Sequence, residues 1–350
     1  MNDRLPPETI IRLDDARSGL RGFIIVHSTA LGPAVGGCRL WRYTDEVAAS
    51  ENALRLAGDM TMANALAGLP FGGAKAVLML PEPPFNRATL FQAFGRAVEG
   101  LGGRFVASGG LGVGPADMAL VASETAHGPP RSDGLAGGDM AEATAHGVFR
   151  AMEVAVSRRL GRTLGEVTVA VQGVGGVGMA LCALLHAAGA RLVIAEPHAE
   201  RAARAAVRFG AEVVQTRLIA QAPADVFAPC ALGGAINLAT LPSLRAKVVC
   251  GAARGQLAAP ELADMLAERG VLYAPDLLVN AGGTISAAAD RLDWPEAERD
   301  ARIDAIGYRL SEILDEAEAL RMPPARVAAI TARRAVATAR PALAKTMLAA

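Results

Sequence analysis

An ordered series of apolar runs and glycines occupies residues 167–196. Residues 167–171 are short, apolar and rich in β-branched side chains, which predicts a buried strand of a parallel sheet. The sequence Gly-Val-Gly-Gly-Val-Gly follows at 173–178, and residues 179–188 have the length and composition of a helix. Residues 191–195 then predict a second strand. The segment therefore predicts a strand, a glycine turn, a helix and a second strand, in this order.

This order is that of a dinucleotide-binding unit, in which each glycine has a physical role. We expect Gly173 to permit the tight turn, Gly175 to let the backbone approach a pyrophosphate and Gly178 to let the helix pack closely on the strand. The first N–H groups of the helix, including those of Gly176 and Val177, would then face the phosphates.

Glu196 stands at the end of the second strand, eighteen residues after Gly178, where a carboxylate can accept hydrogen bonds from an adenosine ribose. A carboxylate would repel the 2′-phosphate of NADP, so NAD is favoured, although Arg201 and Arg204 follow closely and leave NADP open. Residues 167–190 carry no charged side chain, so a transmembrane helix is the alternative. The glycines and the turn within this segment argue against a membrane helix.

The rest of the chain continues the alternation of strands and helices, which predicts an α/β fold. A glycine-rich passage at 31–41 and a Gly- and Pro-rich linker at 128–139 interrupt it. The other predicted elements are a strand at 20–30, helices at 45–57, 86–101, 142–159 and 199–209, strands near Glu212, Val226, Val248 and Leu272, and a helical tail from Trp294 onward.

Composition adds few constraints to this pattern. A length of 350 residues favours two domains, and 35 basic against 35 acidic residues give no net charge that would indicate nucleic acid or a membrane surface. The four cysteines and five histidines have no metal-ligand spacing, so buried free thiols and no metal site are expected. The polar N-terminus lacks the apolar core of a signal peptide, which places the protein in the cytoplasm.

Lys75 is the most unusual polar residue, because it follows a glycine turn and opens a very apolar run at 76–80. Lysine is seldom tolerated in such surroundings unless it is paired or functional, and a desolvated amine suits base or carbonyl chemistry. The alternative is a surface lysine whose stem packs on apolar neighbours while its charge reaches water.

Five motifs together resemble the leucine, valine and phenylalanine dehydrogenases and, more remotely, the glutamate dehydrogenases. The resemblance extends over nearly the whole chain and is far more selective than the glycine pattern alone. Its motifs are LGPAVGGCRLW at 31–41, AGLPFGGAK at 67–75, VQGVGGVG at 171–178, APCALG at 228–233 and NAGG at 280–283.

The resemblance implies a substrate-binding and oligomerisation domain at 1–135, a Rossmann-type NAD-binding domain at 136–290, and a helical segment at 291–350 that packs back across the cleft between them. It implies NAD-dependent oxidation of a small apolar L-amino acid to its 2-oxo acid and ammonia, by a homo-oligomer. Lys75 falls on the catalytic lysine, and Ala231 falls among the cofactor contacts.

The resemblance also implies residues that contact the substrate. The backbone of Gly36 and Gly37 would close over the substrate carboxylate, and Asn280 would lie near both nicotinamide and substrate. Val35 suits an apolar side-chain pocket, to which Ser108 and Thr284 add polarity.

Three positions depart from the family pattern. The family lysine that grips the substrate carboxylate is Ala63, the catalytic aspartate is Gly110, and an Asn-Asn pair is replaced by Arg254-Gly255. Asp117, Asp139 or Arg254 would have to take over the missing roles in an amino-acid dehydrogenase. Two other outcomes are a dehydrogenase for an amine or imine without an α-carboxylate, and a non-catalytic regulatory protein that binds NAD.

Overall fold

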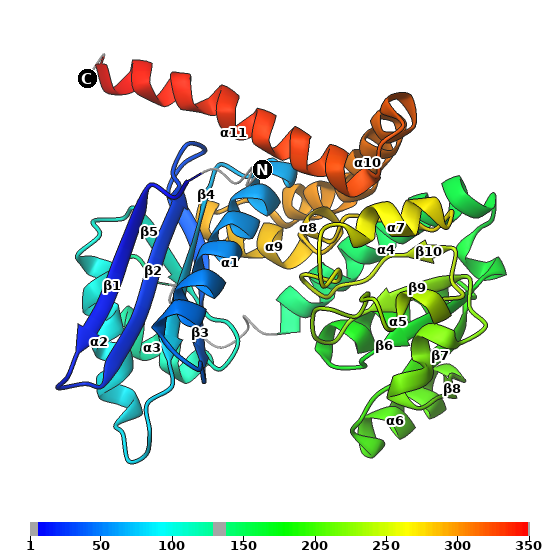
Figure 1. Cartoon of the computed structure of the whole chain (residues 1–350), viewed down its shortest axis with the longest axis horizontal. Helices are drawn as coiled ribbons and strands as arrows, with labels where there is room; N and C mark the ends of the chain where they lie inside the picture. Colours follow the sequence, from blue (N-terminus) through cyan, green and yellow to red (C-terminus); the bar gives the residue numbers. More distant parts are fainter. Residues whose placement is uncertain (1–5, 129–137, 349–350) are drawn as a thin grey trace. The chain divides into compact units, whose positions relative to one another are not determined.

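The computed structural model describes residues 6–128 and 138–348, which form two compact units (Figure 1). Unit 1 comprises Met1–Gly134 with Ala332–Ala350, and unit 2 comprises Leu135–Thr331. Each unit is built from a β-sheet and helices, which confirms the predicted two-domain α/β fold class. The predicted linker lies almost entirely outside the described residues.

Unit 1 contains a five-stranded sheet with the order β1-β2-β4-β3-β5. β1 and β2 form a hairpin, β2 is antiparallel to β4, and β3 is parallel to both β4 and β5. The strands are β1 Thr9–Asp15, β2 Leu20–Ser28, β3 Ala34–Trp41, β4 Gly72–Met79 and β5 Phe105–Ser108, and the helices are α1 Glu46–Leu66, α2 Arg87–Glu99 and α3 Pro115–Ala122.

Helix α1 covers one face of this sheet, and α2 with α3 lies on the other (Figure 1). Small buried residues recur every fourth position on the sheet-facing side of α1, so the helix approaches β2 and β4 closely. A Cβ atom placed on Gly73 of β4 would lie only 2.1 Å from the backbone nitrogen of Thr61. The recurring small residues are Ala49, Ala53, Ala57 and Thr61.

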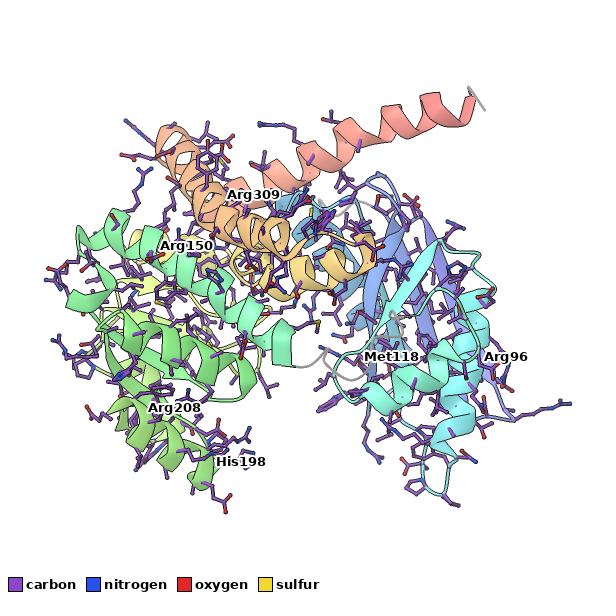
Figure 2. All side chains as sticks on the ribbon, turned by 180° about the vertical axis from the view of Figure 1, so that it is seen from behind. Arg96, Met118, Arg150, His198, Arg208 and Arg309 are labelled. Carbon is purple, nitrogen blue, oxygen red and sulfur yellow. The ribbon has the colours of Figure 1, made fainter. Side chains whose placement is uncertain are left out.

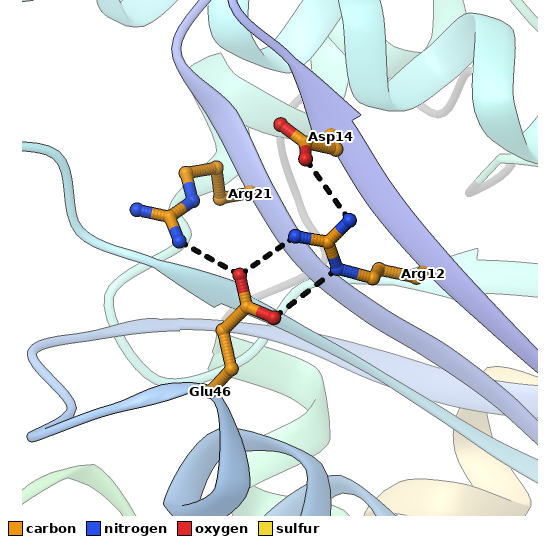
Figure 3. A network of polar contacts seen from close by, with 4 residues as sticks. All are labelled: Arg12, Asp14, Arg21 and Glu46. Atoms are coloured by element: carbon orange, nitrogen blue, oxygen red, sulfur yellow. Dashed lines mark hydrogen bonds and ion pairs between the residues drawn. The ribbon is translucent and has the colours of Figure 1, made fainter.

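The N-terminal turn of α1 is joined to the hairpin by an ion-pair network (Figure 3). The Glu46 carboxylate accepts hydrogen bonds from Arg12 at 3.1 and 3.0 Å and from Arg21 at 2.7 Å, and Arg12 also pairs with Asp14 at 3.1 Å. The hydrogen bonds from Arg12, together with those from Arg21, lower the pKa of Glu46 to about 2. The network fixes where α1 begins on the sheet.

Unit 2 contains a six-stranded parallel sheet with the order β11-β10-β9-β6-β7-β8. All the carboxyl ends of its strands therefore lie at one edge, where ligands bind in folds of this type. The strands are β6 Thr168–Gln172, β7 Arg191–Ala195, β8 Glu212–Val213, β9 Val226–Pro229, β10 Val248–Val249 and β11 Leu272–Tyr273.

The helices of unit 2 include three that pack along one another, α4, α9 and α10. Arg150 of α4, labelled in Figure 2, forms an ion pair with Asp304 of α10 at 3.1 Å. The helices of this unit are α4 Gly138–Leu160, α5 Gly176–Ala187, α6 Ala199–Phe209, α7 Leu262–Glu268, α8 Asp276–Val279, α9 Gly282–Leu292 and α10 Glu296–Leu320, with 3₁₀ turns η1 Leu164–Glu166, η2 Thr216–Gln221 and η3 Leu241–Ser243. Helix α11 Pro324–Leu348 begins in unit 2, and its residues from Ala332 onward belong to unit 1.

The structure corrects two predictions about single elements and confirms a third. The glycine-rich passage at 31–41 contains strand β3, which the sequence pattern did not identify. The helix predicted at 45–57 continues to Leu66 as α1. The charge-free segment at 167–190 folds as β6, a turn and α5, and no helix within the described residues has both the length and the apolar character needed to cross a membrane.

Candidate active site

The loop between β6 and α5 has the geometry expected of a phosphate-binding turn. Gly173 adopts a positive φ of 90°, which glycine tolerates best, and its N–H donates to the carbonyl of Ala195 at 2.8 Å. A Cβ atom on Gly178 would lie 2.0 Å from the carbonyl oxygen of Gly173, so the helix and the turn are in direct backbone contact. A Cβ atom on Gly175 would meet no atom within 4 Å, which leaves open space above the loop. Helix α5 begins at Gly176, so its first N–H groups have no partner within the helix.

Glu196 is held at the end of β7 by two backbone N–H groups. One carboxylate oxygen accepts a hydrogen bond from Val174 of the glycine loop at 3.0 Å, and the other accepts one from His198 at 3.1 Å. The side chain is 5% exposed, and Arg201 pairs with it at 3.4 Å. The oxygen bonded to Val174 can accept a further hydrogen bond, as from a ribose hydroxyl, whereas the other oxygen already faces both His198 and Arg201. Arg201, one of the two arginines that left NADP open in the sequence, uses its guanidinium for the ion pair with Glu196.

Ala231 and Asn280 stand on two other loops at the carboxyl edge of the same sheet. Ala231 follows β9 and lies against the glycine turn, since a Cβ atom on Gly173 would be 2.9 Å from Ala231 Cβ. Asn280 ends α8 and is 4% exposed, yet neither its amide nitrogen nor its amide oxygen has a hydrogen-bond partner among the described residues. Burying an amide without hydrogen-bond partners costs free energy. A ligand that bonds to the amide would remove this cost, so we expect Asn280 to bind one.

A residue that the sequence pattern did not single out, Asp276, organises this edge. One of its carboxylate oxygens accepts hydrogen bonds from the backbone N–H groups of Gly255 at 2.5 Å and Gln256 at 3.3 Å. A signal was present in the sequence, because Asp276 follows Pro275 in the loop after an apolar run.

Lys75 occupies the fourth position of β4, opposite Ile25 of β2. The strand therefore begins at Gly72, three residues before Lys75, and the lysine does not open it. Alternation along the strand places Lys75 on the same face as Val77, which packs against α1. A bulge in β2 between Val26 and Ser28 lies beside this position.

The two glycines of β3 pack tightly beside Lys75. A Cβ atom on Gly37 would lie 2.9 Å from Lys75 Nζ, and one on Gly36 would lie 1.9 Å from the carbonyl oxygen of Ala74. Val35 pairs with Gly73 across the strand boundary. Unit 1 thus brings together Lys75, Gly36, Gly37 and Val35.

The positions that depart from the family pattern are structurally well defined. Ala63 is 1% exposed within α1. Gly110 forms a backbone bridge with Val113, and a Cβ atom at this position would lie 2.5 Å from the carbonyl oxygen of Cys38. The loop conformation therefore suits glycine and leaves no room for a side chain without a local shift.

Asp117 is already committed to a structural role. Arg87 donates two hydrogen bonds to its carboxylate, both at 2.7 Å, and the N–H of Gly114 donates a third at 2.8 Å. The hydrogen bonds from Arg87 lower the pKa of Asp117. The same arginine also donates to the carbonyl of Gly112 at 2.7 Å, so the pair fixes the loop before α3. The side chain of Asp139 lies outside the described residues.

The four cysteines are free thiols, and three of them are buried as predicted, whereas Cys230 is half-buried. Burial raises the pKa of Cys38 and of Cys182 to about 12, and that of Cys230 to about 11. Thiols with such pKa values are mostly protonated at neutral pH. Within residues 6–128 and 138–348, no three His, Cys, Asp or Glu side chains come together as a metal site.

Comparison with known proteins gives matches to two family models. Residues 7–127 match the dimerisation domain of Glu/Leu/Phe/Val dehydrogenase, and residues 194–342 match the Glutamate/Leucine/Phenylalanine/Valine dehydrogenase model. The chain belongs to this dehydrogenase family. This membership confirms the predicted family resemblance and enzyme class and supports NAD as the cofactor.

Individual relatives of this dehydrogenase are similar over almost its whole length. Leucine dehydrogenase of Geobacillus stearothermophilus is 40% identical over 318 residues, which cover 90% of this chain and 87% of that protein. Valine dehydrogenase of Streptomyces coelicolor is 41% identical over 340 residues, covering 95% and 93%. The crystal structure of L-tryptophan dehydrogenase from Nostoc punctiforme has a TM-score of 0.83 and 33% identity, covering 96% of this chain and 98% of that one.

Proposed function

We propose that this dehydrogenase catalyses the NAD-dependent oxidative deamination of a small apolar L-amino acid. The products are the 2-oxo acid, ammonia and NADH, and the reverse reaction is a reductive amination. The observation that carries the proposal is the placement of Lys75 Nζ beside the Gly37 backbone in unit 1, in a family of amino-acid dehydrogenases.

The residues of unit 2 fit NAD. The open space above Gly175 admits a pyrophosphate, the first N–H groups of α5 face it, and the fixed carboxylate of Glu196 accepts hydrogen bonds from the ribose. The unpartnered amide of Asn280 binds the nicotinamide or the substrate. NAD, when bound, accepts the hydride that leaves Cα.

Lys75 handles the proton of the hydrolytic step. After the hydride has left, the substrate is an imine, and a water molecule must add to its carbon. Lys75 accepts a proton from this water as the C–O bond forms and passes it to the imine nitrogen. The C–N bond then breaks as the proton of the new hydroxyl moves to the nitrogen, which releases ammonia and leaves the carbonyl of the 2-oxo acid. A positioned acid–base group of this kind contributes about 10²- to 10⁴-fold to the rate.

The proposal includes assembly into a homo-oligomer in the cytoplasm. Residues 7–127 match a family model that is described as a dimerisation domain, and this match supports self-association. The roles of residues 1–135 in substrate binding and of 136–290 in NAD binding follow the same family pattern.

Formation of NADH by the purified protein tests the proposal. We expect turnover with at least one of L-leucine, L-valine, L-phenylalanine and L-tryptophan at alkaline pH, and in reverse with the 2-oxo acid, ammonium and NADH. Lys75→Met should lower kcat by about 10²- to 10⁴-fold with NADH binding intact. Lys247→Met is the matched control, since Lys247 is exposed and is one of three lysines in the chain. Absence of turnover with every amino acid and 2-oxo acid, despite bound NADH, would refute the proposal.

A further inference from the structure

Arg254 is presented by a rigid loop at the carboxyl edge of the unit 2 sheet. The backbone on both sides of it is fixed, because Ala253 N–H donates to the carbonyl of Pro229 at 2.9 Å and Gly255 N–H donates to Asp276 at 2.5 Å. The carbonyl of Gly255 in turn accepts a hydrogen bond from Gly234 at 2.7 Å. The side chain of Arg254 is exposed, so a guanidinium on a fixed backbone faces solvent at this edge.

The guanidinium is oriented by a residue of helix α9. Arg254 donates a hydrogen bond to Thr284 Oγ1 at 3.0 Å. Thr284 lies in the first turn of α9, four residues after Asn280, whose amide is buried and unpartnered. The Arg254 cation, the Thr284 hydroxyl and the buried Asn280 amide therefore all belong to unit 2, on the loop after β10, on helix α9 and at the end of α8.

We propose that Arg254 binds a carboxylate of the substrate. A guanidinium is always charged at working pH and presents several N–H donors in a planar fork that matches a carboxylate. The hydrogen bond to Thr284 engages one of its nitrogens and sets the direction of the fork. This inference rests on the proposed function.

The cofactor phosphates are a less suitable partner for Arg254. The glycine loop that would hold them follows β6, and β9 separates β6 from β10 in the sheet. Two strand spacings, about 10 Å, separate the end of β10, where the loop of Arg254 begins, from the end of β6, where the phosphate turn begins. The substrate carboxylate that Arg254 binds has two candidates, the α-carboxylate of the amino acid and the carboxylate of an acidic substrate side chain.

The test compares Arg254→Gln and Arg254→Lys with the wild type in steady-state kinetics. The substrates are L-leucine, L-glutamate and 3-methylbutylamine, which is leucine without its carboxylate. We expect Arg254→Gln to raise the KM for the carboxylate substrate roughly 10- to 150-fold and to leave the Kd for NADH unchanged. Arg254→Lys should recover part of the loss, and Thr284→Val should raise KM with a smaller effect on kcat. Arg217→Ala, on the exposed η2 turn, should leave all these values unchanged.

The substrate panel separates the two sources of the carboxylate. A KM increase for leucine assigns Arg254 to the α-carboxylate, and an increase confined to glutamate assigns it to an acidic side chain. An unchanged KM for every carboxylate substrate, or weaker NADH binding with unchanged KM, would overturn the inference. If the wild type shows no turnover, the proposed function fails separately. In that case, calorimetric titration measures the Kd of 4-methyl-2-oxopentanoate and of 2-oxoglutarate for the NADH complexes of the wild type and of Arg254→Gln. The inference requires that at least one of these oxo acids binds more weakly to Arg254→Gln than to the wild type.

Discussion

Gly37 and Lys75 lie so close together that a Cβ atom on the glycine would be 2.9 Å from the amine nitrogen of the lysine. The two residues come from neighbouring strands, β3 and β4, and are separated by the whole of helix α1 in the sequence. The amine of Lys75 therefore lies where a side chain at position 37 would begin. This contact is the structural basis of the first prediction.

Gly37→Ala should impair catalysis more than folding. Its Cβ would press on the flexible end of Lys75 and on the carbonyl of Gly109, and displacement of a reacting group by about 1 Å can cost about 10²-fold in kcat. Gly36→Ala is the contrast, because its Cβ would overlap the backbone carbonyl of Ala74. We expect Gly36→Ala to cost about 1–3 kcal/mol of stability or more, measured by urea denaturation, and Gly37→Ala, whose Cβ would lie 2.8 Å from the Gly109 carbonyl oxygen, to cost less. Equal losses of stability in both variants would contradict this assignment.

Glu196→Gln should weaken dinucleotide binding. Both carboxylate oxygens accept hydrogen bonds from backbone N–H groups, so the amide must direct its NH₂ group at one of these donors. We expect the Kd for NADH to rise roughly tenfold or more, and the preference for NADH over NADPH to narrow because the negative charge is lost. Fluorescence titration of both cofactors measures this, with Glu200→Gln on the exposed start of α6 as the control. An unaltered NADH affinity would remove Glu196 from the cofactor site.

Gly110→Asp should destabilise the protein rather than restore a catalytic aspartate. Its Cβ would lie 2.5 Å from the carbonyl of Cys38, and that loop is also tied to β3 by the hydrogen bond from Leu40 to Leu111 at 2.9 Å. A Cβ at the neighbouring Gly109 would meet its nearest atoms at 3.4 and 3.5 Å, which is ordinary contact. Thermal unfolding should therefore show a lower Tm for Gly110→Asp than for Gly109→Asp. A wild-type Tm for Gly110→Asp, with increased turnover, would show that the loop adapts to an acid.

Asp117→Asn should lower stability at neutral pH and lose this effect in acid. Hydrogen bonds from Arg87 lower the pKa of Asp117 in the folded state, so its contribution is complete above the unfolded-state value of about 3.9 and is lost as the pH falls through the folded-state pKa. Wild type and variant should differ by about 1.5–3 kcal/mol at pH 7, and the difference should shrink below about pH 4. Urea denaturation from pH 7 to pH 3 measures this. Asp59→Asn, which affects an exposed ion pair with Arg55, should cost about 0.5 kcal/mol or less, and a pH-independent difference for Asp117→Asn would exclude the ionic explanation.

The dinucleotide-binding unit was predictable because its signals are local. Strand β6, the turn at Gly173, helix α5 and strand β7 follow one another within 28 residues and need no distant partner to be identified. The family motifs added the enzyme class. The sequence could not show that Glu196 reaches back to Val174, because this hydrogen bond depends on the folded path of the chain.

The elements of unit 1 were harder to predict because packing between distant residues decides them. Strand β3 was missed since Gly36 and Gly37 weaken a strand pattern, and only the contacts with Ala74 and Lys75 explain their presence. Helix α1 was predicted too short, because Gly58 lies within it. A Cβ there would be 3.5 Å from the His27 ring, a contact that no local pattern reveals. The proximity of Arg254 and Thr284 was likewise invisible in the sequence.

The loop that carries Arg254 is held in place independently of the side chain at position 254. Its fold depends on the backbone of Ala253, Gly255 and Gln256 and on the carboxylate of Asp276, and the position-254 side chain takes no part in these bonds. A different side chain at position 254 would therefore change what this loop presents to a ligand, while the backbone of the loop and the sheet beneath it keep their conformation.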